Sequence, residues 1–144
     1  MTVIVGDVRT GVLAADTFCS SGYRSTKLFR TKQGLFGCAG RDDCIVKFED
    51  WKLRKQKKPT EVGEEFAALQ LYQGRLYIWG NALRPELLLS PFDGEPAQWY
   101  AIGSGGDVAN GVLLQGGTVH EALRAAELFD EGTKGPFHMR SEKE

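Results

Sequence analysis

The sequence predicts an α+β fold in which two antiparallel β-sheets lie between two layers of helices. Two observations lead to this class. Short β-branched and aromatic stretches are joined by turns that contain glycine, and amphipathic helical patterns follow the second hairpin and close the chain. Hairpins form antiparallel sheets, and the helices then cover their outer faces, which gives a four-layer αββα sandwich. The length of 144 residues suits a single domain that spans residues 1–144.

Hairpin patterns account for the predicted strands. Each strand is a short run rich in β-branched or aromatic residues, and turns at Gly11, Gly34 and Gly74 separate three of the pairs. The predicted strands are 2–8, 12–16, 27–30, 35–39, 66–72, 75–79, 86–89 and 99–102.

Three stretches carry helical signals. The first begins near Asp42, with acidic residues in its first turn and basic residues in its last, as the helix dipole favours. The second covers 107–115 and ends at a pair of glycines. The third opens with a capping box, in which Thr118 is followed three residues later by Glu121. We expect the polar residues 139–144 to be frayed.

Composition excludes several classes of function. The chain has 18 basic and 19 acidic residues and a net charge of −1, so it lacks the positive surface that nucleic acids or anionic membranes require. It has neither a signal peptide pattern nor an apolar run long enough for a membrane span, which predicts a cytoplasmic protein. Its three cysteines, Cys19, Cys38 and Cys44, cannot all pair, and we expect reduced thiols. With only two histidines, no metal site and no cofactor are expected.

Thr2 is the first candidate for chemistry. Initiator methionine is usually removed before a small second residue, so we expect Thr2 to become the amino terminus. An amino-terminal threonine has a hydroxyl nucleophile and its own general base, because an unperturbed α-amine has a pKa of about 7.7–8.0.

Five short motifs, in order along nearly the whole chain, resemble those of proteasome β subunits and their bacterial HslV-type relatives, which are N-terminal nucleophile hydrolases. In this sequence they are Thr2 with Val-Ile-Val after it, GVLAAD at 11–16, Lys27-Leu-Phe with GCAG at 37–40, AIGSGG at 101–106 and DEGTKG at 130–135. The chain is shorter than typical members of that family, and the loop at 17–26 is contracted, which puts peptide specificity in doubt.

The resemblance implies roles for seven residues. Thr2 would attack the scissile carbonyl, and its amine would take the proton directly or through water. Lys27 would lie beside that amine and favour its uncharged form, and Asp16 would hold Lys27 in place. The backbone N–H of Gly40 would stabilise the oxyanion. Ser104, together with Asp130 and Thr133, would support the amine through hydrogen bonds.

Structural alternatives exist for each of these residues. Asp16 could be a turn residue at the end of a strand, and Lys27 could be an exposed strand residue. Ser104 could cap the helix that follows it. Asp130 and Thr133 could form an ordinary helix end. The glycines at 103–106 could cradle a phosphate, but neither a GxGxxG pattern nor a P-loop lysine is present.

The function implied by the resemblance is threonine-type hydrolysis of peptides or unfolded proteins within a homo-oligomeric ring, with an ATPase that unfolds substrates as a possible partner. Two other functions stay open at this point. One is a catalytically silent structural or binding subunit, which retention of Met1 would favour. The other is hydrolysis of small amides by the same nucleophile.

Overall fold

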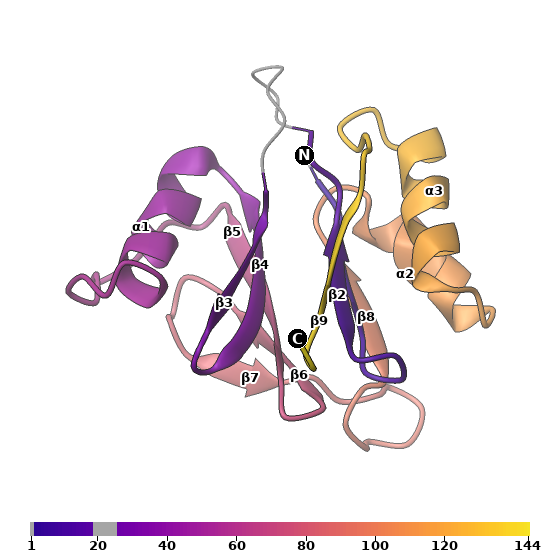
Figure 1. Cartoon of the computed structure of the whole chain (residues 1–144), viewed down its shortest axis with the longest axis horizontal. Helices are drawn as coiled ribbons and strands as arrows, with labels where there is room; N and C mark the ends of the chain where they lie inside the picture. The colour runs from indigo at the N-terminus through magenta and orange to yellow at the C-terminus, as the bar shows by residue number, and fades with distance from the viewer. Residues whose placement is uncertain (1, 19–25) are drawn as a thin grey trace.

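The computed structural model describes residues 2–18 and 26–144. Two antiparallel sheets face each other, with α1 (Asp42–Lys52) on the outer face of one sheet. The outer face of the other sheet is covered by α2 (Gly106–Leu114) and α3 (Val119–Phe129), as Figure 1 shows. The predicted αββα sandwich is therefore confirmed. None of the helices in the described ranges is long and apolar enough to cross a membrane.

The first sheet has four strands in the order β8-β1-β2-β9. Its strands are β1 (Ile4–Asp7), β2 (Val12–Ala15), β8 (Trp99–Ile102) and β9 (His138–Ser141). The second sheet has five strands in the order β3-β4-β5-β6-β7. Its strands are β3 (Leu28–Thr31), β4 (Gly34–Gly40), β5 (Phe66–Tyr72), β6 (Arg75–Trp79) and β7 (Pro85–Leu87).

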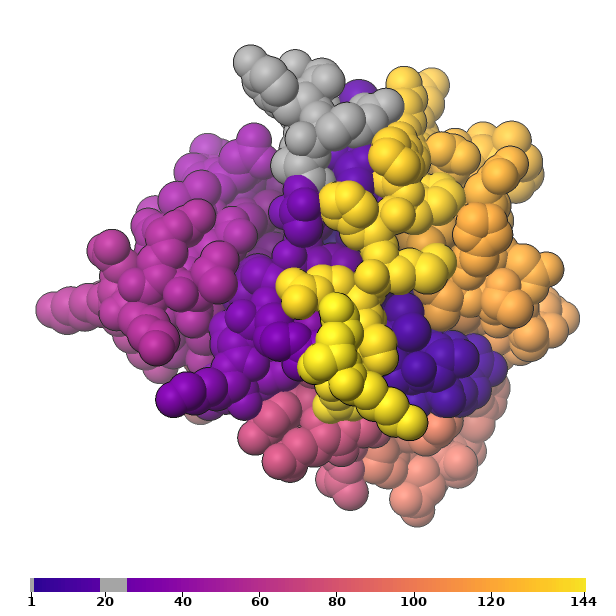
Figure 2. Space-filling view, in the orientation of Figure 1, coloured from indigo at the N-terminus to yellow at the C-terminus, as the bar shows by residue number. Residues whose placement is uncertain are grey.

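The expectation of a frayed carboxyl end was wrong. Residues 138–141 form β9, which pairs with β2 at the edge of the first sheet. Just past the strand, the Glu142 N–H donates to the Gly11 carbonyl at 2.8 Å. At the last residue of β9, the Ser141 carbonyl accepts the Arg30 guanidinium at 2.6 Å. Arg30 belongs to β3, so the last residues link the edges of both sheets, and Figure 2 shows them lying on the surface between the two.

Local sequence signals explain most of the element boundaries. The turn between β5 and β6 consists of Gln73 and Gly74, both with positive φ, at 50° and 73°. Such a pair matches the right-handed twist of a hairpin. The predicted capping box is present: the Thr118 hydroxyl accepts the Glu121 N–H at 3.1 Å, and the Glu121 carboxylate accepts the Thr118 N–H at 2.9 Å.

One stripe of α3 is buried. It consists of Val119, Ala122, Leu123 and Ala126, which pack on β1 and α2. The sequence spacing predicts one helix face made of Ala122, Ala125 and Leu128 with Phe129. The structure leaves 76% of the Leu128 surface and 74% of the Phe129 surface exposed. They lie at the last turn of the helix, past the part that covers the sheet.

The two sheets pack closely because small residues face their common layer. A Cβ atom at Gly6 of β1 would come within 2.6 Å of the Leu76 side chain on β6. Leu13, Leu35, Leu69 and Leu71 fill the remaining space between the sheets. This packing fixes the position of β1, and therefore of the residues at its amino end.

Candidate active site

Thr2 lies at the end of the sandwich where β1 begins, and it is 4% exposed. The register of the first sheet explains which residues surround it. Ile4 pairs with Ala15 on one side and with Ile102 on the other. The residues just beyond β2 and β8 are therefore brought beside Thr2, and they are Asp16 and the turn that contains Ser104.

Asp16 is completely buried, and its carboxylate accepts four hydrogen bonds. Oδ1 accepts the Thr2 hydroxyl, the Lys27 ammonium at 2.8 Å and the Val3 N–H at 3.3 Å. Oδ2 accepts the Lys134 N–H at 3.1 Å. A buried carboxylate is stable only when it is paired and hydrogen-bonded, and these four donors satisfy both conditions.

Lys27 brings a positive charge to the Thr2 hydroxyl. Its side chain is 10% exposed, and its ammonium donates to Thr2 Oγ1, to Asp16 Oδ1 and to the carbonyl oxygen of Phe18. An ammonium in contact with a hydroxyl oxygen stabilises negative charge that develops there. Lys27 is therefore not an exposed strand residue, and Asp16 is not a simple turn residue, because the two form a buried ion pair.

A second chain of hydrogen bonds holds the Thr2 backbone nitrogen. The Thr2 N–H donates to the Ser104 hydroxyl at 3.0 Å, and that hydroxyl donates to Asp130 Oδ2 at 2.8 Å. The Thr133 hydroxyl donates to the same carboxylate oxygen at 2.7 Å. The helix-cap alternative for Ser104 is wrong, because the N-cap of α2 is Gly105 and no side chain caps this helix.

Glycines shape the turn that carries Ser104. Gly103 has a φ of 96°, which lies in the left-handed region, and the Gly105 N–H donates to the Thr2 carbonyl at 3.0 Å. A Cβ atom at Gly105 would come within 2.8 Å of Thr133 Oγ1 and within 3.0 Å of the Ala126 Cβ.

Replacing Gly105 with alanine is expected to lower the free energy of unfolding by about 1–3 kcal/mol, because the added methyl group has no space beside Thr133. Guanidinium denaturation measures the change. Gly111→Ala on α2 is the matched control, since nothing lies within 4 Å of a Cβ atom there. Alanine is the better helix former, so this variant should be unchanged or slightly more stable. Equal stability of the two variants would contradict the packing described for Gly105.

Gly40 is not joined to this network by any hydrogen bond among the residues that the structure describes. It ends β4 immediately before α1, with a φ of 126°, and Figure 1 shows this junction at the same end of the sandwich as Thr2. Its backbone passes close to the Glu65 carbonyl, so a side chain has no space there. Its role as an oxyanion donor stays a prediction.

Sequence reasoning missed the backbone groups of the site. The Lys134 N–H donates to Asp16, and the Phe18 carbonyl accepts from Lys27. Both are backbone groups, so the residue type at these positions does not indicate the contact. The loop that presents Lys134 is held by α3, because the Gly135 N–H donates to the Glu127 carboxylate at 2.8 Å. The Thr17 N–H also donates to the Lys134 carbonyl at 3.3 Å. Spacing alone could not have identified these contacts.

Among the described residues, Cys38, Cys44 and the two histidines make no hydrogen bond to this network. Cys38 and Cys44 are free and buried in the layer between α1 and the second sheet. Burial raises the pKa of the Cys38 thiol well above its usual range, and the Glu49 carboxylate raises this pKa further. Cys19 falls outside the described residues. Among the residues that are described, no group of three or more His, Cys, Asp or Glu side chains could hold a metal ion.

Solved structures with a similar fold are known. Over 96% of this chain and 98% of the other, it is similar to the eukaryotic HslV of Trypanosoma brucei, at 16% identity and a TM-score of 0.67. It is also similar to Thiobacillus denitrificans BPH in complex with epoxomicin, over 98% of both chains at 13% identity and a TM-score of 0.65. A second structure of that BPH matches 98% of this chain and 97% of its own at 14% identity, with a TM-score of 0.61.

These likenesses show that the chain has the fold of HslV and proteasome β-type subunits along its whole length. The resemblance that the sequence motifs indicated is therefore confirmed at the level of the fold. No protein-family model and no curated protein sequence matches the chain.

Proposed function

We propose that the protein is a threonine peptidase of the proteasome type, with Thr2 as its nucleophile after Met1 has been removed. One observation carries the proposal: the Thr2 hydroxyl contacts both the Lys27 ammonium and the buried Asp16 carboxylate, and it lies at the amino end of an HslV-type fold. A structural network alone would not require a lysine on the hydroxyl oxygen.

Removal of Met1 would convert the Thr2 amide nitrogen into an amine. The Ser104 hydroxyl donates its own hydrogen to Asp130 and accepts an N–H from Thr2. It therefore holds one N–H of the amine and leaves the nitrogen lone pair free to act as a base. The Lys27 ammonium, which contacts the Thr2 hydroxyl, would disfavour a second positive charge on the Thr2 amine.

The reaction follows from these positions. Thr2 Oγ1 attacks the carbonyl carbon of a peptide bond while its proton passes to the amine, directly or through water. Gly40 N–H would stabilise the resulting oxyanion. The C–N bond then breaks, and the departing amine takes the proton from the Thr2 ammonium. Water then attacks the ester left on Thr2 while one of its protons passes to the same amine. The bond between the acyl carbon and Thr2 Oγ1 breaks, Oγ1 takes that proton from the ammonium, and the acid is released, so the hydroxyl and the free amine are restored.

Assembly into a homo-oligomeric ring belongs to the same proposal. Leu128 and Phe129 leave a large apolar surface exposed at the end of α3, and such surfaces mark contacts with other proteins. Peptides or unfolded proteins, delivered in the cytoplasm by an ATPase that unfolds them, are the substrates that the HslV likeness favours.

Light scattering after size exclusion, combined with a peptide hydrolysis assay, tests this function. We expect a mass several times the 15.9 kDa of one chain, and hydrolysis of short blocked peptides that elutes with that species. New amino termini in the peptide products would identify the cleaved bonds. A monomer at micromolar concentration would contradict the ring, and an assembled species that cleaves no peptide would favour a silent structural subunit.

A further inference from the structure

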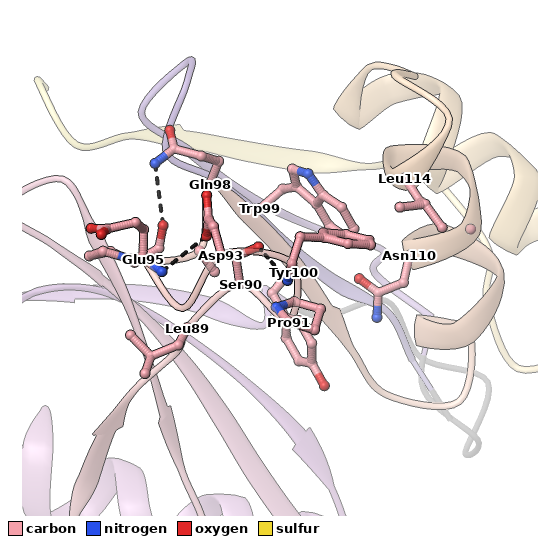
Figure 3. Close-up of a pocket in the computed structure, with 14 residues that line it drawn as sticks. Leu89, Ser90, Pro91, Asp93, Glu95, Gln98, Trp99, Tyr100, Asn110 and Leu114 are labelled. Atoms are coloured by element: carbon pink, nitrogen blue, oxygen red, sulfur yellow. Dashed lines mark hydrogen bonds between the residues drawn. The ribbon is translucent and has the colours of Figure 1, made fainter.

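A groove lies at the opposite end of the first sheet from Thr2. It has a volume of about 550 Å³ and is formed by the loop at 89–98, by the start of β8 and by the second half of α2 (Figure 3). Trp99 pairs with Asp7, at the far end of β1 from Thr2, which places the groove away from the proposed active site. Much of its lining is apolar and open to solvent: Leu89 is 54% exposed, and Leu114 is 52% exposed.

The groove borders an open position on a sheet edge. β8 is the outer strand of the first sheet, and the Val8 N–H donates to the Gln98 carbonyl. Because antiparallel pairing alternates, the backbone groups of Tyr100 then face β1, whereas those of Trp99 and Ala101 face outward. Within the part of the chain that the structure describes, the outward N–H and C=O of Trp99 have no partner.

The positions on either side of Trp99 are already filled. The Asn110 side chain acts like a neighbouring strand, since its amide donates to the Ala101 carbonyl and accepts the Ala101 N–H, both at 2.9 Å. Toward the other end, the Ala97 N–H donates to the Leu88 carbonyl at 2.9 Å. One residue of an added extended chain therefore fits the edge, with both of its backbone groups paired to Trp99.

The groove is formed before any ligand binds. Its outer loop is closed by its own hydrogen bonds: the Ser90 N–H donates to the Glu95 carbonyl at 2.7 Å, and the Gly94 N–H donates to the Ser90 carbonyl at 3.0 Å. A bridge between Leu89 and Pro96 joins the two ends of this loop. A preformed site avoids the entropic cost of ordering a loop on binding.

The charge at the rim of the groove indicates which kind of charged side chain a ligand would carry. The only ionisable side chains at the rim, apart from the Tyr100 phenol, are Asp93 and Glu95, and the described lining contains no lysine, arginine or histidine. Asp93 Oδ1 accepts the Glu95 N–H at 3.0 Å, which keeps both carboxylates on the same turn. A cationic side chain of the ligand would therefore be favoured at this rim.

We propose that this groove binds an extended peptide segment with an apolar side chain and a neighbouring basic side chain. The segment adds a single β-bridge to Trp99, places its apolar side chain against Leu89 and Leu114, and places its basic side chain beside Asp93 and Glu95. This is a second polypeptide-binding site, remote from Thr2, and it does not depend on catalysis at Thr2.

Fluorescence anisotropy tests the proposal with a labelled, blocked peptide of sequence Ala-Lys-Leu-Arg-Ala, on the Thr2→Ala protein so that no cleavage can occur. Saturable binding is expected. A peptide with glutamate in place of both basic residues, and one with an N-methyl group on leucine, should each bind at least about tenfold more weakly, because they lose the charge or the backbone N–H.

Protein variants locate the site. Asp93→Asn combined with Glu95→Gln should weaken binding about tenfold and reduce its salt dependence, and Leu114→Arg should abolish binding. Val46→Arg on α1 is the matched control, because Val46 is 48% exposed and lies far from the groove in sequence and in the fold. It should bind the peptide as the parent protein does.

Three results would overturn the proposal. The first is the absence of saturable binding at millimolar peptide. The second is equal binding of the glutamate peptide. The third is a change in oligomeric mass on Leu114→Arg, measured by light scattering, without any change in peptide binding, which would make the groove a contact between copies of this chain. None of these results bears on the activity proposed for Thr2.

Discussion

Replacing Thr2 with alanine is expected to abolish covalent labelling by an electrophile directed at amino-terminal threonine, and to lower peptide hydrolysis by roughly three orders of magnitude or more. The physical reason is that the variant lacks the proposed nucleophile, the Thr2 hydroxyl that contacts Lys27 and Asp16. Mass spectrometry of digested, labelled protein gives the position of the adduct, and a fluorogenic peptide gives the rate.

Thr60→Ala is the matched control for this experiment, since Thr60 is exposed on the loop between α1 and β5. It should be labelled and should hydrolyse peptide as the parent protein does. Labelling that persists at another residue of the Thr2→Ala protein would reject Thr2 as the nucleophile. Equal loss of labelling and hydrolysis in Thr2→Ala and Thr60→Ala would show that the loss is not specific to the Thr2 hydroxyl.

Replacing Lys27 with methionine is expected to lower the free energy of unfolding by about 3–5 kcal/mol, in addition to abolishing activity. Methionine keeps the unbranched shape and most of the length of the side chain, but it leaves the Asp16 carboxylate buried without its cation. Removing one partner of a buried pair costs this much, because the charge that remains is neither solvated nor paired. Guanidinium denaturation followed by circular dichroism measures the loss.

Two further variants separate charge from packing at this site. Arg54→Met removes one partner of the Asp50–Arg54 pair, whose side chains are 41% and 50% exposed, and it should cost less than about 1 kcal/mol. The double variant Asp16→Asn, Lys27→Met should recover part of the stability lost in Lys27→Met, because no buried charge remains. A double variant less stable than Lys27→Met alone would contradict the assignment of the loss to an unpaired Asp16.

Most of the fold could be predicted because its local signals agree with its packing. The glycine turn at Gly74 and the capping box at Thr118 each correspond to a boundary in the structure. β9 could not be predicted, because its sequence His-Met-Arg-Ser does not alternate between apolar and polar residues. Its position comes from pairing with β2, which is a long-range contact that no local pattern reports.

The candidate site shows the same division. The resemblance indicated the side chains that the fold brings together around Thr2, Asp16 and Ser104. It could not indicate the Lys134 N–H, because a backbone donor is placed by the path of its loop rather than by its residue type. The open edge at Trp99 was equally hidden, since it depends on which strand ends the sheet.

The most direct test of the central claim is the mass of the intact purified protein, measured before and after treatment with an electrophile that requires both the amine and the hydroxyl of an amino-terminal threonine. We expect a chain that lacks Met1 and gains one adduct, which peptide sequencing places on Thr2. A chain that retains Met1 and gains no adduct would contradict the role of Thr2, because its nitrogen would then be an amide that cannot act as a base.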